Sequence, residues 1–188
     1  VDFARRRKHK MEPVELRPLL DESWALVAID ERSSDVEFRN EVCAGLEING
    51  NADRLIQVFV NLLRNALDAV KSTGARPKAE IRAASRAFAW NDQPWISITV
   101  EDNGPGIPSG MLPDIFEAFV TTRLDARGTG LGLAVSEGIV SQHGGTIAAF
   151  NRTQGGATLE VRFPACAARD PQTAPAATIQ QHRSGIQV

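Results

Sequence analysis

The sequence has almost no excess of charge of either sign. Its 188 residues carry 21 Lys and Arg against 23 Asp and Glu, which gives a formal net charge of −2 at pH 7. Such a balance provides no field that would drive binding to a nucleic-acid backbone or to an anionic membrane. We therefore expect no nucleic-acid partner and no direct membrane contact from this segment.

Cysteines and long apolar runs are also scarce. Cys43 and Cys166 are the only cysteines and lie far apart in the sequence, which excludes a disulfide framework and a cysteine-based metal site. The longest apolar stretches are only a few residues, so we expect neither a signal peptide nor a membrane span. These features favour a reducing compartment, the cytoplasm.

Hydrophobic residues make up 43% of the chain, which is normal for a protein with a core, and the length allows one domain with an appendage. Residues 1–10 end in a basic run, typical either of a chain cut from something longer or of a solvated start. Residues 11–165 carry the apolar patterns of a domain. Residues 166–188 are rich in Ala, Gln, Pro and Thr, and we predict a disordered tail or linker there.

Hydrophobic spacing predicts three helices and a set of strands. The helices are expected at about residues 19–27, 53–72 and 133–142. The strand patterns cover residues 36–42, 46–48, 79–89, 95–100, 146–150 and 157–163, with a polar turn at residues 91–94 between two of them. Residues 111–118 are compatible with a short helix, and residues 121–132 predict a glycine-rich loop.

The helix expected over residues 53–72 carries an unusual polar face. At about 100° per residue, its polar side chains fall within a sector roughly 80° wide; they are Gln57, Asn61, Asn65, Asp68 and Ser72. Exposed helix faces usually carry Lys and Glu, which favour helix more than Asn does. The face is therefore either a plain solvated surface or a set of amide oxygens aimed at a hard cation such as Mg²⁺.

A second motif follows the strand that ends near residue 102. Asp102 is followed by Gly104 and Gly106, which is consistent with a simple turn between elements. Alternatively, the carboxylate accepts a hydrogen bond from the exocyclic amine of a flat heterocycle. That geometry favours adenine, because guanine presents a carbonyl oxygen where adenine presents the amine.

A third motif, Gly128-Thr129-Gly130-Leu131-Gly132-Leu133, opens the last predicted helix. Successive backbone N–H groups before a helix N-terminus form an anion site, for which phosphate is the natural ligand. The motif is neither a Walker A loop nor a Rossmann fingerprint. The catalytic triplets of Ser/Thr/Tyr protein kinases are also absent.

Taken together, these motifs resemble the N, G1, F and G2 boxes of the histidine-kinase catalytic domain, a member of the GHKL ATPase superfamily. The resemblance covers roughly residues 11–165 and is closest to sensor kinases of the nitrogen and C4-dicarboxylate type. Residues 1–10 would then be the end of a preceding dimerisation helix or a linker. The motifs are Asn61-x-x-x-Asn65-Ala66-x-Asp68-Ala69, Asp102-x-Gly104-x-Gly106, Phe116-x-x-Phe119 and the glycine-rich segment from Gly128 to Leu133.

The resemblance implies an α+β fold, a two-layer α/β sandwich in which a mixed sheet of about five strands has its helices on one face. It also implies ATP and Mg²⁺ as cofactors, with Asn61 and Asn65 as catalytic residues and Asn65 as the metal ligand. The nucleotide contacts implied by the motifs are Asn61, Asn65, Asp68, Asp102, Gly104, Gly106, Ile107, Phe119, Thr121, Thr122, Arg123, Gly128, Thr129, Gly130, Leu131 and Gly132.

The implied activity is transfer of the γ-phosphoryl group of ATP to a histidine on a dimerisation domain absent from this chain. The implied downstream partner is a response regulator. Hydrolysing members of the superfamily have Glu at the position of Asn61, and an amide cannot accept a proton from water. None of His9, His143 and His182 has the context of a phosphoacceptor, and His143 is expected to be structural. A homodimer is expected only for the full-length protein, whose anchoring in an inner membrane is left open.

Two alternatives remain: a serine-directed kinase of the same superfamily, and a nucleotide-binding scaffold without phosphotransfer. One residue departs from the family pattern. Many histidine kinases have Lys or Arg where this sequence has Asp68, and a carboxylate there would repel phosphate. Arg123 or Arg64 could then supply the missing positive charge.

Overall fold

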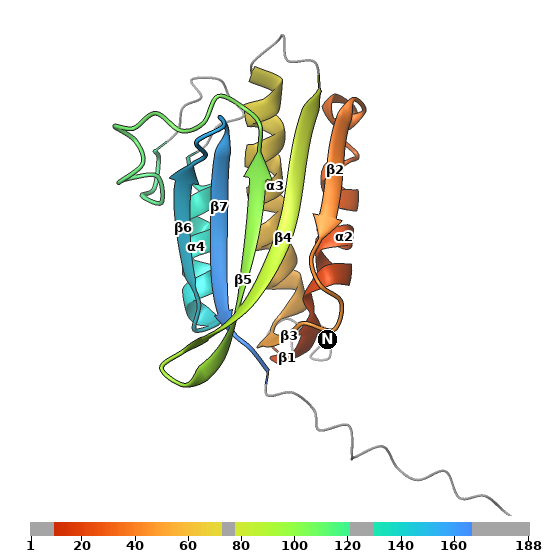
Figure 1. The fold of residues 1–188 in the computed structure, drawn as a ribbon, viewed down its shortest axis with the longest axis vertical. Coiled ribbons are helices and arrows are strands. Elements are labelled where there is room, and N and C mark those ends of the chain that lie inside the picture. Colours follow the sequence, from red (N-terminus) through yellow and green to blue (C-terminus); the bar gives the residue numbers. More distant parts are fainter. Residues whose placement is uncertain (1–9, 73–77, 121–129, 167–188) are drawn as a thin grey trace, which may run out of the picture.

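The computed structural model describes residues 10–72, 78–120 and 130–166, which form an α/β sandwich (Figure 1). One layer is a mixed five-stranded sheet and the other consists of three helices, so the expected α+β fold is confirmed. The helices are α2 (Leu16–Val27), α3 (Ala52–Ser72) and α4 (Gly132–Gln142), with a short 3₁₀ turn η1 (Glu31–Ser33). The strands are β1 (Glu12–Glu15), β2 (Val36–Glu41), β3 (Glu47–Gly50), β4 (Ala79–Trp90), β5 (Gln93–Asp102), β6 (Thr146–Asn151) and β7 (Ala157–Pro164).

The main sheet has the order β2-β4-β5-β7-β6, and β1 and β3 form a separate two-stranded sheet. Strand β2 runs parallel to β4, whereas all other neighbours in the main sheet are antiparallel. This order places β5 at the centre. Because both neighbours are antiparallel to it, the end of β5 lies beside the first residues of β4 and β7, with Asp102 opposite Ile81 and Glu101 opposite Thr158.

The core lies between the sheet and the helices. Every second residue of β5 points to the helices, and Ile96, Ile98 and Val100 are buried there. The apolar side of α3 packs over them, with Phe59 and Leu62 completely buried. The polar side of α3 faces away from the sheet, where Asn61 contacts the start of α4 and Asp68 contacts η1.

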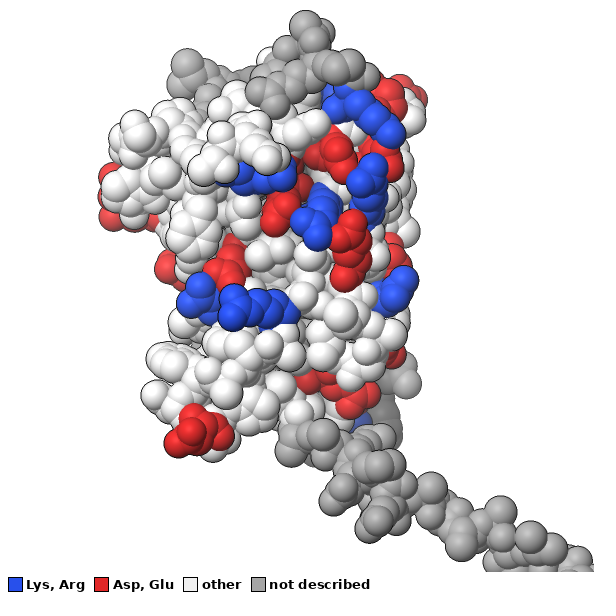
Figure 2. All heavy atoms as spheres, viewed as in Figure 1, with Lys and Arg blue, Asp and Glu red and all other residues white. Residues whose placement is uncertain are grey.

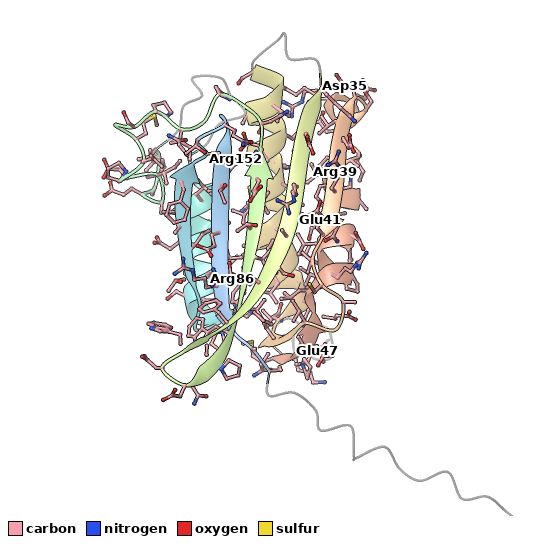
Figure 3. The ribbon with its side chains drawn as sticks, viewed as in Figure 1. Asp35, Arg39, Glu41, Glu47, Arg86 and Arg152 are labelled. Atoms are coloured by element: carbon pink, nitrogen blue, oxygen red, sulfur yellow. The ribbon has the colours of Figure 1, made fainter. Side chains whose placement is uncertain are left out.

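Among the described residues, no helix lies over the opposite face of the sheet, and acidic and basic side chains are interspersed on it (Figure 2). Arg39 and Glu41 of β2, Arg86 of β4 and Arg152 after β6 lie along this open face (Figure 3). Strands with one buried and one solvated face alternate in this way in antiparallel sheets. Among the described residues, no helix has the length and apolar character needed to cross a membrane.

Two local predictions differ from the structure. The short helix over residues 111–118 is wrong: this segment is a series of turns, with Asp114 N–H donating to the Met111 carbonyl at 3.2 Å. Pro113 has no N–H to donate, which weakens a helix there. The β4–β5 turn is also tighter than predicted, since Asn91 and Asp92 alone form it with φ of 50° and 58°, typical of a two-residue hairpin.

Candidate functional site

The Asp102 carboxylate is held in place at the end of β5. The residue is buried, and its Oδ1 accepts hydrogen bonds from the N–H of Gly104 at 2.8 Å and of Ala157 at 3.3 Å. Gly104 lies so close to α3 that a β-carbon on it would meet Ala69 at 2.9 Å. The glycine therefore lets the loop pass between the carboxylate and α3, which brings Asp102 beside the helix that carries the polar face.

The loop after Asp102 is fastened to strand β6. Asn151, the last residue of β6, accepts from Ile107 N–H and donates to the Ile107 carbonyl, each at 2.7 Å. Gly106 has φ of +81°, and a β-carbon there would lie 2.8 Å from Asn151 Oδ1. Asn151 escaped the sequence analysis, because an asparagine at a strand end gives no signal of a partner 44 residues away.

Asn61 links α3 to the start of α4. Its amide nitrogen donates to the Gly132 carbonyl at 3.1 Å and to Ser136 Oγ at 3.2 Å. Because the nitrogen is used in this way, the Asn61 oxygen is the atom left for a ligand. Asn65, one turn further along α3, is exposed, and its side chain makes no hydrogen bond with another described residue.

Asp68 forms an ion pair that the sequence did not predict. Arg32 of η1 donates from Nη1 to Asp68 Oδ1 at 2.8 Å, and it also holds Asp30 through Nε at 3.0 Å. The Asp68 side chain is 11% exposed. Arg32 therefore offsets part of the negative charge that was expected to repel phosphate, because it pairs with Asp30 as well as with Asp68. Arg64 is exposed to solvent, and Arg123 lies outside the described residues.

Helix α4 begins without a side-chain cap. The residue before it, Leu131, provides no capping hydrogen bond, and the first turn contains no acidic residue. Within the described part of the chain, no side chain caps the N–H groups of this first turn, and the helix dipole favours an anion there. The phosphate site at Gly130, Leu131 and Gly132 stays a prediction.

Phe119 and Gly130 bring together the two ends of the glycine-rich segment. Phe119 N–H donates to the Gly130 carbonyl at 2.9 Å, and a β-carbon on Gly130 would lie 2.6 Å from the Phe119 backbone. The Phe119 side chain is 76% exposed. The remaining predicted contacts of this segment lie outside the described residues: Thr121, Thr122, Arg123, Gly128 and Thr129.

The donors on α3 fit Mg²⁺ rather than a metal held by the protein alone. Among the described residues, no group of three His, Cys, Asp or Glu side chains is placed to hold a metal ion. Amide oxygens such as that of Asn65 are hard ligands suited to Mg²⁺, which takes its other ligands from phosphates and waters. If Mg²⁺ binds here, phosphate oxygens and waters would complete its coordination.

Comparison with known proteins identifies the family of this chain. The profile of the histidine kinase-, DNA gyrase B-, and HSP90-like ATPases matches residues 50–167. The C4-dicarboxylate transport sensor protein DctB of Pseudomonas aeruginosa is 34% identical over 162 residues, which are 86% of this chain and 26% of that protein. Sensor histidine kinase ZraS of Escherichia coli is 36% identical over 164 residues, 86% of this chain and 33% of that protein.

A solved structure with the same fold supports this family assignment. The catalytic domain of histidine kinase ThkA matches with a TM-score of 0.68 and 27% identity, covering 82% of this chain and 95% of that domain. The chain thus has the extent of a histidine-kinase catalytic domain but spans only about a quarter to a third of the length of DctB and ZraS. From the match over residues 50–167 and the shared fold, the chain belongs to the family of histidine kinase-, DNA gyrase B- and HSP90-like ATPases.

Proposed function

We propose that this chain binds Mg-ATP and donates the γ-phosphoryl group to a histidine on a separate dimerisation domain, as the catalytic part of a two-component sensor kinase. The observation that carries the proposal is the convergence of three features at one end of the sandwich. They are the buried carboxylate of Asp102, the polar face of α3 and the uncapped N-terminus of α4.

Asp102 selects adenine in this proposal. Its Oδ1 is fixed by two backbone N–H groups, so the carboxylate cannot turn to suit a different base. An adenine amine donates to it, whereas the guanine carbonyl would face carboxylate oxygens and leave both groups unpaired. The chain should therefore bind ATP and reject GTP.

The phosphates lie between α3 and α4. The free N–H groups at the start of α4 neutralise phosphate charge, and Asn61 holds α4 against α3 through Gly132. Asn65 is the ligand for Mg²⁺, which supplies charge neutralisation on the phosphate oxygens. Arg32 pairs with Asp68, which reduces the repulsion between the Asp68 carboxylate and the phosphates.

The residues of the site promote transfer by positioning. The Asn61 side chain is an amide whose nitrogen already donates to α4, so it accepts no proton from an attacking water. ATP is then held until an incoming nucleophile reaches the γ-phosphoryl group in line. This favours transfer to a protein side chain over hydrolysis.

The acceptor histidine belongs to another domain. His143 is bound at both ring nitrogens, with Nδ1 donating to the Ile139 carbonyl at 2.8 Å and Nε2 accepting from Asn51 N–H at 3.0 Å. It therefore joins the end of α4 to the start of α3 as a structural residue. The names of DctB and ZraS as a sensor protein and a sensor histidine kinase support histidine over serine as the acceptor.

Nucleotide binding is tested by calorimetric titration with ATP and GTP in the presence of Mg²⁺. We expect ATP alone to bind, and Asp102→Ala to abolish binding. Asp92→Asn is the matched control, because it removes a carboxylate from the distant β4–β5 turn. An Asp102→Ala variant that keeps wild-type affinity would refute the adenine assignment.

Phosphotransfer is tested with the histidine-containing dimerisation domain of a C4-dicarboxylate sensor as the acceptor. The chain is mixed with this domain and labelled ATP, and the label is then tested for stability in acid and in base. Label that is lost in acid but kept in base indicates phosphohistidine. Acid-stable label would favour the serine-directed kinase, and no label despite ATP binding would favour the scaffold.

A further inference from the structure

The turn between β6 and β7 is pressed against the backbone of Asp102. Gly156 in this turn has φ of +91°, and a β-carbon on it would lie 1.9 Å from the Asp102 carbonyl oxygen. The next residue, Ala157, donates its N–H to the Asp102 carboxylate. The turn therefore contacts both the main chain and the side chain of the residue that we assign to adenine.

Arg152 completes this contact. Its Nη1 donates to the Asp102 carbonyl oxygen at 2.8 Å. The arginine backbone is itself anchored in the turn, since its N–H donates to the Gly156 carbonyl at 3.0 Å and its carbonyl accepts from Gly155 N–H at 3.1 Å. Both ends of Arg152 are thus tied, one to the turn and one to the end of β5.

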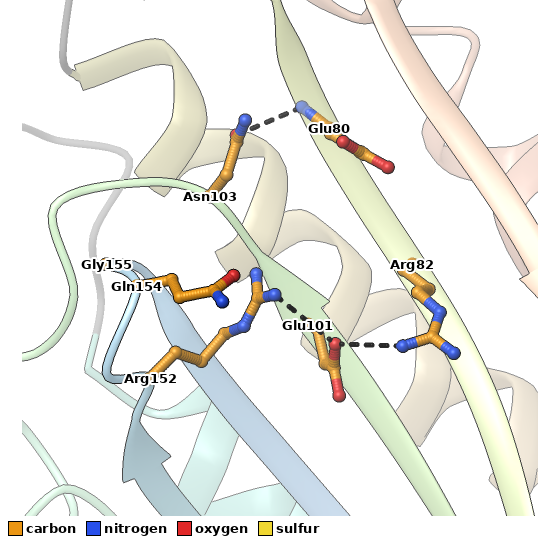
Figure 4. Close-up of a pocket in the computed structure, with 7 residues that line it drawn as sticks. All are labelled: Glu80, Arg82, Glu101, Asn103, Arg152, Gln154 and Gly155. Carbon is orange, nitrogen blue, oxygen red and sulfur yellow. Dashed lines mark hydrogen bonds and ion pairs between the residues drawn. The ribbon is translucent and has the colours of Figure 1, made fainter.

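The guanidinium of Arg152 lies among charged side chains on the open face of the sheet (Figure 4). Its Nη2 is 3.7 Å from Glu101 Oε2, and Arg82 approaches the same carboxylate at 3.4 Å. These three side chains line a cavity of about 200 Å³. Arg152 therefore reaches Asp102 from the face of the sheet that lies opposite the helices.

A carbonyl oxygen held by a guanidinium has a fixed direction, because a hydrogen bond from a charged donor is stronger than one between neutral groups. The same peptide unit carries the Asn103 N–H, which donates to the Glu80 carbonyl at 3.3 Å. The peptide that follows Asp102 is thus fixed at both of its polar atoms. A binding carboxylate needs such support, since misplacement by about 0.5 Å already weakens recognition.

We propose that Arg152 is a positioning residue for adenine recognition, acting through the Asp102 backbone from the open face of the sheet. The inference rests on the proposed nucleotide site. It predicts that a side chain with no contact to the nucleotide controls how well the protein distinguishes adenine from a purine without the 6-amine. Nothing in the sequence around Arg152 indicates this role.

The test compares Arg152→Met with Arg82→Met in the full 188-residue chain. Both substitutions remove an arginine next to Glu101, but only Arg152 contacts Asp102. Affinity is measured by calorimetry for ATP and for purine riboside triphosphate, which lacks the 6-amine. We expect Arg152→Met to weaken ATP binding about tenfold and Arg82→Met to change it by less than about twofold.

The ratio of the two affinities separates positioning from general damage. Arg152→Met should lower the preference for ATP over the analogue about tenfold, whereas a merely destabilised protein would lose affinity for both nucleotides equally. Arg152→Lys keeps the charge and a single donor nitrogen, so it should restore part of the preference; it also serves if the Met variant fails to fold.

Three results would count against the reasoning, and they are distinguishable. A wild-type chain that does not bind ATP refutes the proposed function and this inference with it. If the wild type binds ATP and Arg152→Met binds it equally well, only the inference fails. An equal loss of affinity for ATP and the analogue also refutes it, because Arg152 then acts on the fold and not on adenine recognition.

Discussion

Removing Arg32 should expose the negative charge of Asp68 at the proposed phosphate site. The Asp68 side chain is 11% exposed and that of Arg32 is 39% exposed. Breaking a fully buried pair costs about 3–5 kcal/mol and breaking an exposed one about 0–1 kcal/mol. For this half-buried pair we expect Arg32→Met to lower the free energy of unfolding by about 1–2 kcal/mol, a fall in Tm of about 2–8 °C.

Loss of the Arg32 charge beside Asp68 should also weaken ATP binding, most strongly at low salt, where charges are least screened. Thermal melting and calorimetry are therefore run on Arg32→Met, Asp68→Asn and the double variant. Arg39→Met is the control, since it removes an arginine that pairs with Glu37 and Glu80 on the open face. This control should change Tm by less than Arg32→Met.

Asp68→Asn should restore ATP affinity in the Arg32→Met background, because it removes the negative charge that Arg32 offset. A double-mutant cycle isolates this pair from the separate contact between Arg32 and Asp30. Two results would refute the reasoning. One is that Arg32→Met and Arg39→Met melt alike, and the other is that the two substitutions at the pair have purely additive effects.

Three further predictions concern other parts of the molecule. Asn65→Ala should reduce the Mg²⁺ dependence of ATP binding without changing Tm. Asn61→Ala should lower Tm as well, because it removes the hydrogen bond from α3 to the start of α4. Identical Mg²⁺ titrations for Asn65→Ala and wild type would exclude Asn65 as the Mg²⁺ ligand. Gly156→Ala forces a β-carbon to 1.9 Å from a carbonyl oxygen at a φ of +91°, so urea unfolding should show a loss of about 2–4 kcal/mol. The pKa of Glu37 is lowered from 4.5 to about 2, mainly by a hydrogen bond from Arg39. The stabilisation that the ionised Glu37 provides is therefore present above pH 4.5 and is lost as the pH falls towards 2. Glu37→Gln should flatten that part of an acid-unfolding curve.

Periodicity was sufficient to predict most of the elements. The helix predicted over residues 53–72 is α3, Ala52–Ser72, and the one predicted over residues 133–142 is α4, Gly132–Gln142. These predictions succeeded because each helix buries one side against the sheet, and that burial requires apolar residues at helical spacing. Where this signal was weak, over residues 111–118, the predicted helix was wrong.

The position of Asp102 was also readable from the sequence. Alternation along β5 indicates which residues face the helices, and Asp102 continues the buried set of Ile98 and Val100. A carboxylate at the end of a buried strand, followed by glycines, therefore indicates a candidate site even without knowledge of its partners. Its assignment to adenine stays a prediction until nucleotide binding is measured.

The partners of the polar side chains were decided by tertiary structure alone. Arg32 meets Asp68 across 36 residues, Asn151 meets Ile107 across 44, and Arg152 meets the Asp102 carbonyl across 50. Hydrophobic spacing reports which side of an element is buried, but it carries no information on which polar group arrives from another element. That choice depends on strand order and on distances of a few ångströms, because hydrogen bonds and ion pairs weaken quickly with small displacements. The sequence by itself thus determined the elements and the motifs, while the order of the sheet decided which charges are balanced and what holds the candidate adenine site in place.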